Sequence, residues 1–129
     1  MKQQFDDWIA KTKLKTALWV IGRRMKKQNQ ENPEFQALLK DKELILQLQT
    51  HDKSVMWHYV IKQMAIISKP GMHHNPSSIV SFVDAPYALN LILKPKTQIF
   101  MAGLQNKAVI ASGDLAQLMW FADIGKYLR

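Results

Sequence analysis

The spacing of the apolar residues changes at Glu43, from a helical period to strict alternation. Before this point Leu14, Leu18, Ile21 and Met25 recur every three or four residues, which predicts a helix over residues 2–28. From Glu43 to Thr50 the leucines of ELILQLQT stand at every second position, as in a half-buried strand. Because the helical and strand-like stretches are segregated along the chain, the sequence predicts an α+β fold rather than a doubly wound sheet.

The other helices and strands are predicted from the spacing of their apolar residues and from the turn residues between them. We expect strands at 43–50, 55–63, 64–69, 77–83 and 108–112, and further helices at 33–39, 87–94, 97–104 and 115–128. The turn at 51–54 makes the first two strands a hairpin. Asp84 and Asp114 are predicted N-caps, and Gly103 and Gly113 are predicted turn glycines.

The positive charge is concentrated at the N-terminus. The chain carries +8 in total, and residues 1–27 hold eight basic against two acidic side chains. Phe5, Trp8 and Ile9 are expected to extend the apolar side of the first helix. This helix either packs on the body of the protein or docks on an anionic membrane, and we retain membrane docking as our interpretation. Nucleic-acid binding is a weaker explanation of the same positive charge. The predicted membrane contacts are Trp8, Lys11, Lys15, Trp19, Arg23, Arg24 and Lys27.

Several classes of chemistry find no support in the sequence. There is no cysteine, phosphate loop, dinucleotide motif or nucleophile elbow. The four histidines have no carboxylate at metal-ligand spacing, and His58 is expected on a solvated face. We therefore predict a protein that is not an enzyme and that has no metal or cofactor. The first residues contain no signal-peptide core or membrane span, which favours a cytoplasmic location, at most peripheral at the inner face of the membrane.

The C-terminal third is unusually apolar. From Ser77 to Ala122 there are five charged residues in 46 positions, whereas the 22% charged fraction of the whole chain predicts about ten. Ordinary core packing explains part of this surface. Taken together with the resemblance described next, we interpret the rest as surface reserved for a ligand.

The same region resembles a known family. The segment SFVDAPYALNLIL, followed by PKTQIFMAGLQNKAVIASGDLAQLMWF, is similar to the sterol carrier protein type-two family of lipid-binding domains. The matching positions are Phe82, Asp84, 100–103, 109–112 and Gly113-Asp114, and the resemblance extends over residues 43–125. The segment between Gly103 and Gly113 is longer than in compact members, and the N-terminal helix lies outside the shared region.

This resemblance implies a five-stranded, mainly antiparallel sheet covered by helices, with an apolar tunnel between sheet and helices. The tunnel would take a sterol-like, fatty acyl, phospholipid or isoprenoid molecule. The residues expected to line it are Phe82, Leu89, Leu93, Phe100, Met101, Leu104, Ile110, Leu115, Leu118, Met119 and Ala122.

We therefore expect a basic amphipathic helix at 1–30 and a sterol carrier-like domain at 31–129. The expected function is non-enzymatic lipid binding, with the N-terminal helix docking on membrane. The alternative is an accessory protein for enzymes of lipid or quinone biosynthesis, and a homodimer is left open. Another side of the last helix carries Trp120, Ile124 and Tyr127. These residues could form a lid, a dimer contact or a second core layer, and the sequence does not distinguish these roles.

Overall fold

A computed structural model of the chain describes residues 2–94 and 97–128. The elements are α1 (Lys2–Glu31), α2 (Pro33–Leu39), β1 (Leu44–Thr50), β2 (Met56–Lys62), β3 (Ala65–Pro70), β4 (Ser78–Phe82), α3 (Ala85–Leu93), α4 (Thr97–Gln105), β5 (Val109–Gly113), α5 (Leu115–Ile124) and a 3-10 turn (Gly125–Tyr127). The predicted elements are confirmed to within a few residues. The last helix is shorter than predicted, because it tightens into the 3-10 turn at Gly125.

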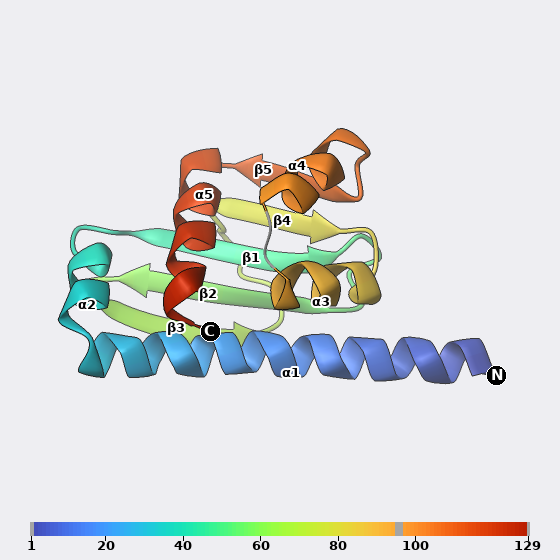
Figure 1. Cartoon of the computed structure of the whole chain (residues 1–129), viewed down its shortest axis with the longest axis horizontal. Coiled ribbons are helices and arrows are strands. Elements are labelled where there is room, and N and C mark those ends of the chain that lie inside the picture. Colours follow the sequence, from blue (N-terminus) through green and yellow to red (C-terminus); the bar gives the residue numbers. More distant parts are fainter. Residues whose placement is uncertain (1, 95–96, 129) are drawn as a thin grey trace.

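The five strands form one mixed sheet in the order β3-β2-β1-β4-β5. β1 and β4 are parallel, and the other neighbours are antiparallel. The predicted α+β class and mainly antiparallel sheet are confirmed. Helices α2, α3, α4 and α5 lie on one face of the sheet, while α1 runs along the β3 side and extends beyond the strands at its N-terminal end (Figure 1).

The sheet has one helix-covered face and one face that no described helix covers. Leu46 pairs with Tyr59 and Ser78, so these side chains share the helix-covered face. The buried apolar side chains on this face are Leu44, Leu46, Leu48, Trp57, Tyr59, Ile61, Val80 and Phe82. Their neighbours in sequence, such as Gln47 and His58, point to the opposite face because side chains alternate along a strand.

The connection between β3 and β4 must pass β2 and β1, which lie between them in the sheet. It does so across the helix-free face, where it contacts Gln47 and His58. Gln47 Oε1 accepts a hydrogen bond of 3.0 Å from the backbone N–H of His73, and His58 Nδ1 lies 3.0 Å from the carbonyl oxygen of Gly71. This connection covers His58, which is only 8% exposed. The expectation of a solvated His58 is therefore wrong, although its side of the sheet was inferred correctly.

Helix α1 is a structural part of the core. Leu14, Leu18 and Met25 are buried, and the hydroxyl of Tyr59 donates a hydrogen bond to the carbonyl oxygen of Leu18. Gly22 lets the helix approach β3 closely, because a Cβ atom at Gly22 would come within 2.6 Å of Ser68 Cβ. Packing on the body, one of the two alternatives for this helix, is therefore confirmed for its middle and C-terminal parts.

The start of α1 does not join this packing. Phe5 and Trp8 were expected to extend the apolar side of the helix, but they are 60% and 62% exposed. Their rings stack on each other instead, with centroids 6.3 Å apart. The expectation is wrong because Phe5 and Trp8 lie on a different side of the helix from Leu14, Leu18 and Met25. The first turns of α1 also extend past the strands (Figure 1).

The predicted N-caps are confirmed, and one of the predicted turn glycines is not. Asp84 accepts a hydrogen bond of 2.8 Å from the N–H of Tyr87, and Asp114 accepts one of 3.0 Å from the N–H of Ala116. Gly113 has φ +85°, as a turn glycine should. Gly103 lies inside α4, where a Cβ would come within 2.7 Å of Val109 Cγ2. Its small size serves helix-to-strand contact rather than a turn.

The turn between β1 and β2 is built around the carboxylate of Asp52. It accepts hydrogen bonds from the hydroxyl and the N–H of Ser54 and from the hydroxyl of Thr50, at 2.7–3.0 Å. These bonds, those of Ser54 first, lower the pKa of Asp52 from 3.8 to about 2. Because the pKa is lower in the folded state than in the unfolded chain, the carboxylate contributes stability above about pH 4.

The corresponding prediction concerns acid pH. The excess stability of the wild-type protein over Asp52→Asn should be constant from neutral pH down to about pH 4 and should shrink as the pH falls toward about 2. Urea unfolding at several pH values measures this difference. A difference that stays constant over this range would contradict the role of the ionised carboxylate.

Candidate functional site

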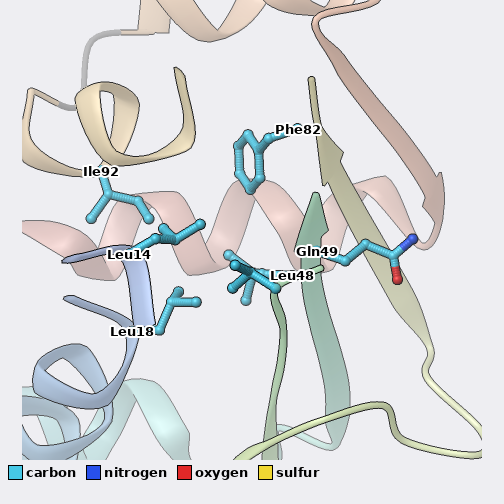
Figure 2. Close-up of a pocket in the computed structure, with 7 residues that line it drawn as sticks. Leu14, Leu18, Leu48, Gln49, Phe82 and Ile92 are labelled. Atoms are coloured by element: carbon cyan, nitrogen blue, oxygen red, sulfur yellow. The ribbon is translucent and has the colours of Figure 1, made fainter. Parts of the chain in front are cut away.

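An apolar seam lies between α1, α3 and the sheet. Leu14 and Leu18 line it from α1, Ile92 from α3, and Leu48 and Phe82 from β1 and β4; Gln49 and Val55 complete it. The aliphatic side chains and the ring of Phe82 converge, whereas the amide of Gln49 points away from them (Figure 2). The site therefore presents hydrocarbon from two helices and two strands.

The seam is closed in this structure. The space between these side chains is nowhere wide enough for a water molecule, so the cavity volume is about 0 Å³. Pockets that hold small ligands occupy about 300–1,000 Å³. A lipid chain could fit only if α1 or α3 moved away from the sheet.

The residues predicted to bind lipid are distributed over different environments. Phe82 lines the seam and Leu118 is buried in the core, while Leu89, Phe100 and Leu104 are half-buried. The exposed members are Leu93, Met101, Ile110, Leu115, Met119 and Ala122. Ile110 is separated from the others, because it pairs with Ser81 on the helix-free face. The binding role of these residues stays a prediction.

Sequence reasoning missed most of the residues that line the seam. Leu14 and Leu18 were recognised as the apolar side of a helix, but not as neighbours of Phe82. Leu48, Val55 and Ile92 are ordinary strand, turn and helix positions. Their spacing relative to other apolar residues, every second position in a strand or every fourth in a helix, shows that they face inward. It does not show which residue from a distant part of the chain each of them contacts.

The exposed side of α1 carries aromatic and basic residues in one row. At 100° per residue, Phe5, Trp8, Lys15, Trp19, Arg23 and Lys26 fall within one quarter of the helix surface, on a different side from Leu14, Leu18 and Met25. All six are exposed, and we call them the outer stripe. The guanidinium carbon of Arg23 lies 5.0 Å from the ring centroid of Trp19. The stripe thus combines aromatic rings with cationic groups on one surface.

The predicted membrane contacts agree only in part with this stripe. Trp8, Lys15, Trp19 and Arg23 belong to it, and Lys27 is exposed beside it. Lys11 is paired with Asp7 at 2.7 Å, and Arg24 donates a 2.7 Å hydrogen bond to the carbonyl oxygen of Leu128. Phe5 and Lys26 were not among the predicted contacts. In the described part of the chain, no helix has the length and apolar character needed to cross a bilayer.

The residues on the other side of the last helix extend the core. Ile124 is buried, and the ring of Tyr127 packs edge-on against that of Phe35, with centroids 5.8 Å apart. Trp120 is half-buried, and the ammonium group of Lys42 lies 5.5 Å from its ring centroid. Of the alternatives left open for these residues, the structure therefore favours a second core layer.

Three of the four histidines, His58, His73 and His74, lie close together on the helix-free face. The rings of His58 and His73 lie 5.3 Å apart, and those of His73 and His74 stack at 4.6 Å. Over residues 2–94 and 97–128, no group of three or more His, Cys, Asp or Glu side chains has an arrangement that could hold a metal ion.

The mixed sheet with its helices on one face is similar to solved structures of the sterol carrier protein type-two fold. The resemblance inferred from residues 43–125 is confirmed at the level of the fold by similar solved structures. No family model and no curated protein matches the sequence.

Among solved structures, "UbiJ-SCP2 Ubiquinone synthesis protein" matches 86% of this chain and 96% of its own, with a TM-score of 0.63 and 12% identity. Sterol Carrier Protein 2 Like 2 from Aedes aegypti matches 85% of this chain and 97% of its own, with a TM-score of 0.54 and 18% identity. A sec-alkylsulfatase from Pseudomonas sp. is similar over 72% of this chain, which corresponds to 13% of the sulfatase, with a TM-score of 0.53 and 11% identity.

Proposed function

We propose that this protein binds an apolar lipid, without catalysis, between its sheet and its helices. The observation that carries the proposal is the apolar seam between α1, α3 and the sheet, in a fold of the sterol carrier type. A solution structure similar to this chain is that of the Aedes aegypti protein in a palmitated form. The ligand class is a sterol-like, fatty acyl, phospholipid or isoprenoid molecule.

The energetics of an apolar chain are sufficient for binding. About fifteen buried methylenes contribute on the order of 12 kcal/mol, at ~0.8 kcal/mol each. Association and ordering cost at least several kcal/mol, and separating the layers of the closed seam adds to this cost. The expected affinity is therefore micromolar at best, and binding needs no ion pair.

The exposed apolar residues of α3, α4 and α5 support a binding surface larger than the seam. Leu93 is 66% exposed, Leu115 54% and Met101 46%, and their helices lie on the same face of the sheet (Figure 1). Exposed apolar side chains that gather on one surface are typical of ligand or partner sites. We propose that the predicted residues on these helices contact the part of the lipid that extends beyond the seam.

A charge placed in the seam should prevent binding. With a fluorescent fatty acid as probe, Ile92→Glu should bind at least about tenfold more weakly than wild type, because a carboxylate on the seam-lining side of α3 puts a charge where the ligand would meet hydrocarbon. Asn90→Glu adds the same charge at an exposed position of the same helix and should bind normally. Equal affinities of the two variants, or no uptake of the probe by wild type, would overturn the proposal. Native mass spectrometry would identify any lipid that co-purifies.

We further propose that the outer stripe of α1 docks on an anionic membrane. Trp8 and Trp19 would sit at the interface between headgroups and acyl chains, with Lys15, Arg23 and Lys26 near the headgroups. The protein would then be cytoplasmic and peripheral to the inner face of the membrane. Docking is expected to be reversible and sensitive to salt, since about 1 kcal/mol comes from each basic residue near the surface.

The membrane proposal predicts a position-dependent effect of charge. Replacing Lys15, Arg23 and Lys26 by glutamine should weaken binding to phosphatidylglycerol-containing vesicles by about 100-fold. Replacing Lys53, Lys62 and Lys69, which are equally exposed elsewhere, changes the net charge by the same amount and should have a much smaller effect. Vesicle co-sedimentation measures both. If the two triple variants lose affinity equally, attraction is a property of net charge and the outer stripe is not the docking surface.

An accessory role in lipid or quinone biosynthesis is the second candidate. It is favoured by the similarity to "UbiJ-SCP2 Ubiquinone synthesis protein", which extends over nearly the whole of both chains. In this role a biosynthetic enzyme would be the partner, and the same site would present an isoprenoid substrate to it. Preference for an isoprenoid quinone over a fatty acid of similar length, in displacement of the fluorescent probe, would support this candidate.

A further inference from the structure

The two edges of the sheet are protected differently. At one edge, α1 packs against β3 through Gly22 and Ser68, and the strand itself carries Lys69 and Pro70. Charged residues, proline and covering elements are the usual devices that keep an edge strand from pairing with another chain. At the other edge, β5 reads Val-Ile-Ala-Ser-Gly and carries neither a charged residue nor a proline, while α4 packs on its helix-covered face where Gly103 approaches Val109.

The outward-facing backbone groups of β5 can be assigned from its pairing with β4. Asp114 donates its N–H to the carbonyl oxygen of Ser77, and Ala108 accepts from the N–H of Val83. In an antiparallel ladder the bonded residues alternate, so the even-numbered residues of β5 bond to β4. The N–H and C=O groups of Val109, Ala111 and Gly113 therefore point away from β4, toward the open edge.

We propose that this edge pairs with the β5 strand of a second copy of the chain, in an antiparallel arrangement with its two-fold axis at Ala111. In this register Val109 lies opposite Gly113 of the other copy, and Ala111 lies opposite its own counterpart. The outward-pointing N–H and C=O groups of the two strands then bond to each other, because the outward-pointing residues of one strand lie opposite those of the other. A register shifted by one residue would leave them without partners.

The side chains are compatible with the same register. Ile110, which is 49% exposed, lies beside Ser112 of the second copy on the helix-free face, so that part of its apolar surface is covered. Lys107 and Asp114 flank the strand at its two ends. The antiparallel arrangement brings Lys107 of one copy near Asp114 of the other, and opposite charges at neighbouring cross-strand positions are favourable. The edge is thus complementary to itself in hydrogen bonding and in charge.

The test is the oligomeric state of the full chain, measured by sedimentation velocity over the micromolar range. Wild type should show concentration-dependent dimers. Ile110→Lys places a charge at the paired edge and should weaken association by at least about tenfold. Ile67→Lys is the matched control, because Ile67 is 44% exposed on the same face but lies in β3. It should dimerise like wild type.

A second variant probes the backbone directly. Ala111→Pro removes an N–H that points to the open edge and leaves the bonds to β4 in place, so it should abolish the dimer while the monomer stays folded. In wild type, the amides of Val109, Ala111 and Gly113 should become protected from hydrogen exchange as the concentration rises. A wild-type chain that stays monomeric, or an equal loss of dimer in the two lysine variants, overturns the proposal. These outcomes are independent of lipid binding, which the fluorescent probe reports separately.

Discussion

A chain reduced to residues 31–129 is expected to be unfolded, whereas a chain that lacks only residues 1–8 should keep its full stability. The longer truncation removes Leu14, Leu18 and Met25 from the core. Loss of each side chain costs about 2–5 kcal/mol, so together they amount to most of the 5–15 kcal/mol that stabilises a typical domain. The hydroxyl of Tyr59 also loses its acceptor, the carbonyl oxygen of Leu18.

The shorter truncation is the matched control, because it removes Phe5 and Trp8, which are mostly exposed. Far-UV circular dichroism and urea unfolding compare the two chains. Cooperative unfolding of residues 31–129 with a near-normal midpoint would show that the helix is an appendage and that residues 31–129 fold alone. In that case the core positions of α1 would contribute little stability.

Gly113→Ala is expected to lose about 2–4 kcal/mol of stability, which is a large loss for the addition of a single methyl group. Two costs combine at this position. Its φ of +85° disfavours any residue with a Cβ atom, and the added Cβ would overlap the carbonyl oxygen of Ser77 on the neighbouring strand. Because that oxygen accepts the N–H of Asp114, it cannot move without loosening the junction between β5 and α5.

Gly71→Ala separates the two costs. Gly71 has a similar φ of +95°, but no atom lies within 4 Å of the added Cβ. We expect this variant to lose about 1 kcal/mol, which is the cost of the backbone conformation alone. Urea unfolding measures both variants. Equal losses of stability in the two variants would mean that the added methyl group at position 113 avoids Ser77 at no cost. The close approach of Gly113 to Ser77 would then not restrict which residue can occupy position 113.

The sequence predicted the elements well because each is specified locally. Alternating leucines predicted β1, and the capping residues Asp84 and Asp114 predicted where α3 and α5 begin. The glycines show the limit of such reasoning. Gly113 was recognised as a turn residue, but Gly103 lies in a helix, and its small size is explained only by Val109, which belongs to another element.

The candidate site was predicted less completely than the fold. Phe82 was identified among the lining residues, but Leu14, Leu18 and Ile92 belong to helices whose place on the sheet the sequence does not define. Ile110 was among the residues that the resemblance placed along the tunnel. Its register with Ser81 places it on the other face of the sheet.

By itself, the sequence determined the order of helices and strands, their caps and the concentration of positive charge at the N-terminus. These properties depend on residues within one or two turns of each other. The tertiary structure decided which face of the sheet the helices cover, that α1 closes the seam, and that Phe5 and Trp8 stay exposed. The physical reason is that the period of the apolar residues shows which side chains share one side of a helix or strand. Which other element packs on that side is decided by contacts between distant segments of the chain.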